Sequence, residues 1–67
     1  MTLGERIAQL RREAGLSQEG LAERMGVSRQ AVSKWENGSS EPSTANLLAL
    51  AKLYGVDLGA LLEGVEP

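Results

Sequence analysis

The stretch QEGLAERMGVSRQAVSKW, residues 18–35, predicts two short helices joined by a sharp bend. Gly26 interrupts the first helix, and Ser28 is placed to cap the second, because a serine hydroxyl accepts a hydrogen bond from a free N–H in the first helical turn. The apolar residues of both helices recur at helical spacing: Leu21, Ala22, Met25, Ala31, Val32 and Trp35. Two helices joined by a turn that contains glycine are the sequence form of a helix-turn-helix.

The helix expected over residues 29–37 has two unlike faces. At about 100° per residue, one arc is polar throughout and carries Arg29, Gln30, Ser33, Lys34 and Asn37. The opposite arc carries Ala31, Val32 and Trp35, which we expect to face the core. The polar arc is then free to meet a partner, although an ordinary solvated helix face has the same composition. The pattern alone leaves both interpretations open.

A first helix is expected to begin after Thr2, which is a suitable N-cap residue. Its inward stripe is Leu3, Ile7, Leu10 and Ala14, with steps of four, three and four residues. Gly15 follows where a residue with left-handed backbone commonly ends a helix. Ser17 then caps the helix that precedes the bend at Gly26.

Two more helices are expected after the bend. Ser43 is the expected cap of a helix that Gly55 ends, and its broad apolar face is Leu47, Leu48, Leu50, Ala51, Leu53 and Tyr54. Asp57 caps a last short helix with Leu58, Leu61 and Leu62, and residues 64–67 are expected to be frayed. No segment has the alternation of a useful strand. The sequence therefore predicts an all-α fold of five helices in a single domain over residues 1–67.

Composition argues against several classes of function. The 67 residues include no cysteine and no histidine, which excludes disulfides, Cys/His zinc sites and Cys or His nucleophiles. No glycine-rich phosphate loop is present, and so small a helical domain leaves little room for a cleft. We therefore expect no enzyme activity, cofactor, metal or small-molecule ligand. No apolar run is long enough for a membrane span, so we expect a cytoplasmic protein.

The charge is modestly acidic overall but unevenly distributed. The formal net charge is −2, with six of the seven cations in residues 1–38. Five acids in that segment leave it at +1, whereas Lys52 and four acids give residues 39–67 a charge of −3. One face for phosphate and another turned away would produce this asymmetry. A face for phosphate would suit a nucleic-acid-binding protein. The negative total charge keeps open the alternative, a protein-interaction or antitoxin-like module with little DNA affinity.

Three blocks in this order and spacing resemble the phage-repressor/Cro-like helix-turn-helix domains, also called XRE-like. They are GLSQEGLAERMGVSRQAVSKWENG at residues 15–38, Pro42-Ser43, and LLALAKLYGVDLGALL at residues 47–62. The resemblance covers about residues 3–63. It implies a compact five-helix, lambda-repressor-like DNA-binding domain with its helix-turn-helix at about residues 18–37. It also implies a transcriptional regulator, most often a repressor, that binds a two-fold operator as a homodimer.

The same resemblance assigns roles to individual residues. It implies that the helix over residues 29–37 enters the major groove of double-stranded DNA and reads bases with Arg29, Gln30, Ser33 and Lys34. Phosphate contacts would come from Gln18, Ser28, Asn37 and Arg11. Arg11 and Glu36 match a pair that bridges the first and third helices in such domains. A solvent-exposed pair of this kind would contribute only about 0–1 kcal/mol to stability.

Overall fold

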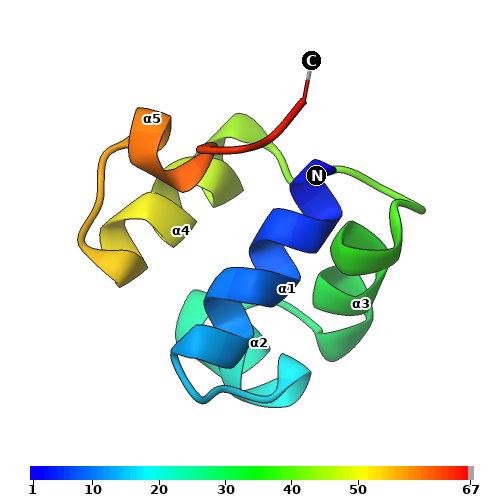
Figure 1. The fold of residues 1–67 in the computed structure, drawn as a ribbon. Coiled ribbons are helices and arrows are strands. Elements are labelled where there is room, and N and C mark those ends of the chain that lie inside the picture. Colours follow the sequence, from blue (N-terminus) through cyan, green and yellow to red (C-terminus); the bar gives the residue numbers. More distant parts are fainter. Residues whose placement is uncertain (67) are drawn as a thin grey trace.

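The structure, a computed structural model, describes residues 1–66, which form five α-helices and no strand (Figure 1). The helices are α1 (Leu3–Glu13), α2 (Gln18–Met25), α3 (Arg29–Asn37), α4 (Thr44–Tyr54) and α5 (Leu58–Leu61). Helix α1 lies between α3 on one side and the α4–α5 pair on the other in Figure 1, with α2 beneath it. The all-α prediction is confirmed, and α2 and α3 occupy the segments predicted for the helix-turn-helix.

Each helix begins directly after the polar N-cap residue that the sequence predicts. The Thr2 hydroxyl accepts from the Glu5 N–H, and the Glu5 carboxylate accepts from the Thr2 N–H at 2.7 Å, which is a reciprocal capping box. That backbone hydrogen bond from Thr2 lowers the pKa of Glu5. The other four N-caps each accept an N–H from three residues ahead: Ser17, Ser28, Ser43 and Asp57. Gly26, with φ of 70°, ends α2 in the left-handed conformation that the bend requires.

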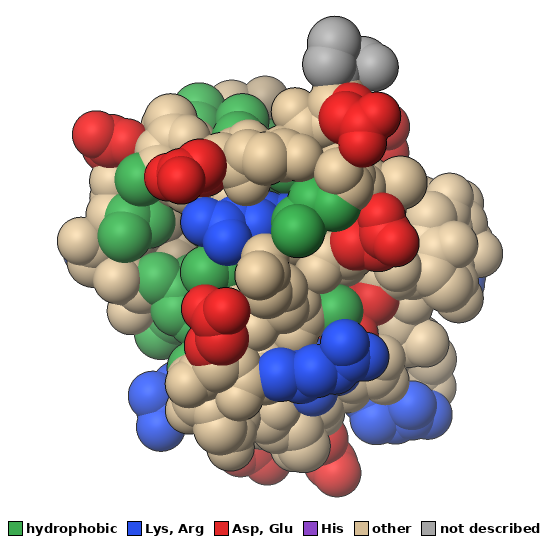
Figure 2. Space-filling model, viewed as in Figure 1, with side chains coloured by type: hydrophobic (Ala, Val, Ile, Leu, Met, Phe, Trp, Pro, Cys, Tyr) green, Lys and Arg blue, Asp and Glu red, His purple; other side chains and the backbone are tan. Residues whose placement is uncertain are grey.

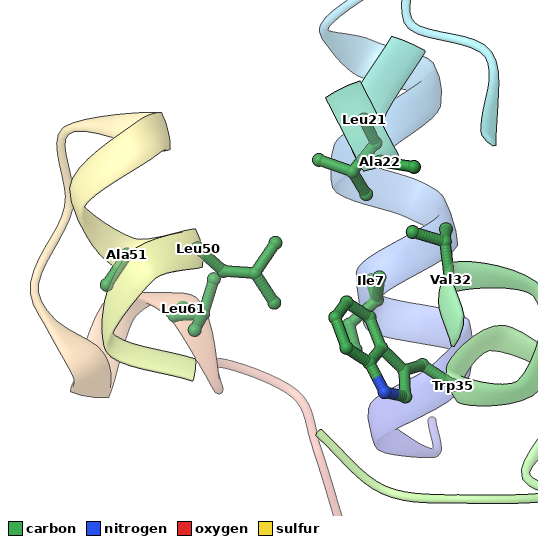
Figure 3. Packing of buried hydrophobic residues seen from close by; sticks show 8 residues of the cluster. All are labelled: Ile7, Leu21, Ala22, Val32, Trp35, Leu50, Ala51 and Leu61. Atoms are coloured by element: carbon green, nitrogen blue, oxygen red, sulfur yellow. The ribbon is translucent and has the colours of Figure 1, made fainter. Parts of the chain in front are cut away.

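All five helices contribute side chains to one core. Figure 3 shows its buried members, which are Ile7, Leu21, Ala22, Val32, Trp35, Leu50, Ala51 and Leu61. Val32 is fully buried and Trp35 is 5% exposed, so the predicted apolar arc of α3 faces inward. The core thereby fixes the rotation of α3 about its own axis and turns the opposite arc to solvent.

Helix α1 approaches the end of α3 more closely than side chains would permit. Gly4 is buried, and a Cβ atom there would collide with the Trp35 and Glu36 carbonyl oxygens, the latter at 2.6 Å. The contact is between the backbone of α1 and the backbone of α3, and it requires glycine. No sequence pattern indicates this role, because the atoms that exclude a side chain at Gly4 belong to a helix far along the chain.

Two residues that we predicted to face the core are exposed instead. Ala14 is the C-cap of α1, where the chain turns toward Gly15, and so it leaves the inward stripe. Leu48 is 54% exposed, because it lies off the face of α4 that packs on the core, which consists of Leu47, Leu50, Ala51, Leu53 and Tyr54. Both errors have the same cause: helical periodicity ranks the faces of a helix but does not show how far its neighbours extend over them.

The prediction that residues 64–67 are frayed is wrong for residues 64–66, and Pro67 lies outside the described residues. The Met1 ammonium donates to the Glu66 carboxylate at 2.8 Å and to the Gly64 carbonyl oxygen at 3.0 Å. The Glu66 N–H in turn donates to the Met1 carbonyl oxygen. Hydrogen bonding to the ammonium lowers the pKa of Glu66. The partners are more than 60 residues apart in sequence, so no local pattern indicates this contact.

Among the helices of residues 1–66, none combines the length and the apolar character needed to cross a bilayer. In the same range, no three acidic side chains come together as a possible metal-binding group.

Candidate nucleic-acid interface

The exposed arc of α3 carries the residues predicted to read bases. Arg29, Gln30 and Lys34 are exposed, and Ser33 is half-buried. Val32 and Trp35 anchor the same helix from its inner side. The side chains of the exposed arc therefore stand on a helix that is fixed by the core, and none of the three exposed ones is needed to fill space inside the fold.

Two of the predicted phosphate-binding residues lie at the two ends of α3. Ser28 is exposed, and its hydroxyl accepts from the Ala31 N–H at 3.1 Å as the N-cap. Asn37 is also exposed, and its Oδ1 accepts from the Ser39 N–H at 2.8 Å. The Asn37 bond leaves the amide NH2 as a donor for an outside group.

Arg11 and Glu36 form the predicted bridge between α1 and α3, but they are largely buried. Arg11 donates through Nε to one oxygen of Glu36 at 2.7 Å and through Nη2 to the other at 3.1 Å. Only 11% of the Arg11 side chain and 8% of the Glu36 side chain are exposed. The hydrogen bonds that Arg11 donates to the Glu36 carboxylate raise the pKa of Arg11. The pair therefore differs from the exposed, weakly stabilising pair considered from sequence, because breaking a buried pair leaves an uncompensated charge.

Arg11 has a second partner residue, and Glu36 has a second donor residue. Nη1 of Arg11 donates to the Leu16 carbonyl oxygen at 2.8 Å, just beyond the end of α1. Gln18 donates through Nε2 to the same Glu36 oxygen that Arg11 Nη2 contacts, at 3.1 Å. The Glu36 carboxylate thus joins α1, α2 and α3. Sequence reasoning missed the Gln18 contact, because a spacing of 18 residues carries no local signal.

Tyr54 brings α4 to the edge of this cluster. Its hydroxyl is buried and has no hydrogen-bond partner within residues 1–66. Burial raises its pKa, and the nearby Arg11 charge opposes that shift. The phenol is therefore neutral at neutral pH and adds no charge to the Arg11–Glu36 pair.

An open groove of about 460 Å³ runs between α1 and α3 and brings three of the predicted site residues together. Its lining consists of Glu5, Ala8, Arg12, Gln18, Ser33, Glu36 and Asn37. Ser33 and Asn37 belong both to the exposed arc of α3 and to the wall of the groove. One predicted base-reading residue, Ser33, therefore lines the same groove as two predicted phosphate-binding residues, Gln18 and Asn37.

Comparisons with known proteins agree with this geometry. A family model described as helix-turn-helix matches residues 7–61. The chain is 42% identical over 66 residues to the HTH-type transcriptional activator BcrR of Enterococcus faecalis, covering 98% of this chain and 32% of that protein. It is 43% identical over 66 residues to the HTH-type transcriptional regulator DicA of Escherichia coli, covering 98% of this chain and 49% of that protein. The chain thus spans a third to a half of these two relatives.

Solved structures show the same fold. The P22 c2 repressor in complex with a synthetic operator superposes with a TM-score of 0.83 at 39% identity, covering 96% of this chain and 97% of that one. The biofilm master regulator SinR in complex with DNA superposes with a TM-score of 0.81 at 33% identity, covering 92% of this chain and all of the other. The lambda-repressor-like architecture expected from the resemblance is thereby confirmed.

Proposed function

This chain belongs to the helix-turn-helix family, and we propose on that basis that it is a sequence-specific double-stranded DNA-binding domain of a transcriptional regulator. The observation that carries the proposal is the division of α3 into a buried arc, Val32 and Trp35, and an exposed arc of hydrogen-bonding side chains. A helix held in this way presents a fixed set of donors and acceptors to the major groove. The proposed role is binding rather than catalysis, and its place is the cytoplasm.

In this proposal the exposed arc reads the base edges. Arg29 and Lys34 donate to guanine O6 and N7, and Gln30 pairs with adenine N6 and N7. Ser33, which is half-buried, is the fourth residue proposed to contact the bases. Good bidentate contacts of this kind are worth about 1–3 kcal/mol of discrimination against the wrong base.

The phosphate contacts position the helix without reading sequence. Ser28 and Asn37 lie at the two ends of α3, and Gln18 lies at the start of α2, where backbone N–H groups also favour an anion. Arg11 has five N–H donors, of which three are occupied by Glu36 and Leu16. Two remain to meet a phosphate, in an orientation that the ion pair fixes.

We also propose that the protein acts as a homodimer on a two-fold operator and that it is a repressor. The P22 c2 repressor, which is similar along nearly the whole chain, binds a synthetic operator. On this chain, exposed apolar side chains occur on α4, in the connection that follows it and at the start of α5: Leu48, Val56 and Leu58. Exposed leucine and valine side chains of this kind suit contact with a second copy.

The alternative is a protein-interaction or antitoxin-like module, which the net charge of −2 favours. The two functions differ in their response to salt. Phosphate contacts release counterions, so DNA affinity falls steeply as salt rises. No DNA binding at low salt, or retention that ignores salt, would favour the alternative.

Selection of binding sites from random duplex DNA tests the proposal directly. We expect enrichment of a two-fold sequence whose half-sites lie about 34–36 Å apart, or a multiple of that distance. The affinity for the enriched duplex should fall as salt is raised from about 50 to 200 mM. Selection that enriches no sequence would contradict sequence-specific binding.

A further inference from the structure

Arg12 is the cation of the groove between α1 and α3. It shares that groove with Gln18, Ser33 and Asn37, which the proposed function already assigns to DNA. Arg12 is exposed, and within residues 1–66 its side chain forms no hydrogen bond and no ion pair. Figure 2 shows most lysine and arginine side chains of the drawn face in its lower half, where α2 lies in Figure 1.

The two neighbouring arginines have opposite environments. Arg11 points its guanidinium at Glu36 and the Leu16 carbonyl oxygen, and 11% of its side chain is exposed. Arg12, one position on, turns about 100° around the helix and lines the open groove. Three N–H donors of Arg11 are occupied within the fold, whereas the whole guanidinium of Arg12 is available to an outside anion.

The acids along the groove do not neutralise this end of it. The carboxylate of Glu36 is occupied by Arg11 and Gln18, so its charge is already paired. Glu5 lies two turns of α1 before Arg12, and its carboxylate accepts the Thr2 N–H. Arg12 is therefore the cation among the lining side chains with which an anion in the groove can pair.

We propose that Arg12 binds the phosphodiester backbone of duplex DNA, together with Gln18 and Asn37, when α3 occupies the major groove. This inference rests on the proposed DNA-binding function and adds a residue to it. Ala8 also lines the groove. Because its side chain is small, it leaves space there for the DNA backbone. A phosphate in the groove would touch α1, α2 and α3 at once, and it would fix the angle at which α3 meets the base pairs.

The test is the salt dependence of DNA binding by Arg12→Gln, with Arg12→Lys and Lys52→Gln as matched variants. Lys52 is exposed on α4, carries the same charge and does not line the groove. For Arg12→Gln, the slope of log affinity against log salt should become shallower by about 0.9, because one phosphate contact is lost. Its affinity should fall by the same factor on the enriched duplex and on a scrambled one, while its melting temperature stays unchanged.

Arg12→Lys should restore most of the slope, and Lys52→Gln should leave it at the wild-type value. A slope for Arg12→Gln equal to that of Lys52→Gln, with wild-type binding intact, would overturn the role of Arg12 and leave the proposed function standing. A wild-type protein that fails to bind DNA at low salt would overturn both.

Discussion

Glu36 is the residue whose carboxylate links the helix-turn-helix to α1. It accepts from Arg11 twice and from Gln18 once, and it is almost fully buried. A buried charge that loses its partner costs far more than a surface pair contributes. Glu36 therefore acts on the site through the fold, since it orients both Arg11 and Gln18.

Replacement of Glu36 by glutamine tests this. Glu36→Gln leaves the Arg11 charge without a counterion, so we expect the free energy of unfolding to fall by about 3 kcal/mol. This value is at the low end for a broken buried pair, because glutamine retains one acceptor oxygen. Urea denaturation measures the change. Glu23→Gln, an exposed acid on α2, is the control and should shift stability by no more than about 0.5 kcal/mol. Equal effects in the two variants would show that the cluster is not a stabilising contact.

The sequence alone predicted part of this residue-scale picture. Arg29, Gln30 and Lys34 could be placed on an exposed arc because helical periodicity depends on one helix at a time. The Arg11–Glu36 bridge followed from the family resemblance, and its burial did not. The contact of Gln18 with Glu36 and the position of Arg12 in the groove depend on how three helices pack, which no local spacing records.

At the scale of elements, the close approach of α1 to α3 decides where the exposed arc stands. Gly4 allows the two backbones to meet, because a side chain there would collide with the Trp35 and Glu36 carbonyl oxygens. The ends of the helices could be predicted, since the caps at Ser17, Ser28, Ser43 and Asp57 are local contacts over three residues. The exposure of Leu48 and the contact of Met1 with Glu66 could not, since both depend on residues distant in sequence.

Gly4→Ala should therefore force α1 and α3 apart. Overpacking of this kind costs about 1–3 kcal/mol, which thermal or urea unfolding would reveal as a lower midpoint. Gly59→Ala is the matched control, because the added methyl group would lie 3.4 Å from a side-chain oxygen of Asp57, an ordinary contact. We expect that control to be neutral or to stabilise α5 by up to about 1 kcal/mol. A neutral Gly4→Ala would contradict the close approach.

At the scale of the whole molecule, charge and packing divide the chain in the same way. Residues 1–38, which form α1, α2 and α3, carry six of the seven cations, and residues 39–67 carry a net charge of −3. The first segment holds the groove and the exposed arc of α3. The second completes the core through Leu50, Ala51 and Leu61. Five acids nearly balance the six cations of the first segment, which leaves it a formal charge of only +1. In the proposed homodimer, two copies on a two-fold site would double the DNA contacts of one copy.

The most direct test of this account is the affinity of Lys34→Ala for its enriched duplex and for a scrambled duplex of the same length. Lys34 is exposed, so we expect an unchanged melting temperature, a loss of about 1–3 kcal/mol on the enriched duplex and a much smaller loss on the scrambled one. Arg29→Ala should behave in the same way, and Lys52→Ala should not. Equal losses on both duplexes, or intact affinity with a lower melting temperature, would contradict base reading by the exposed arc of α3.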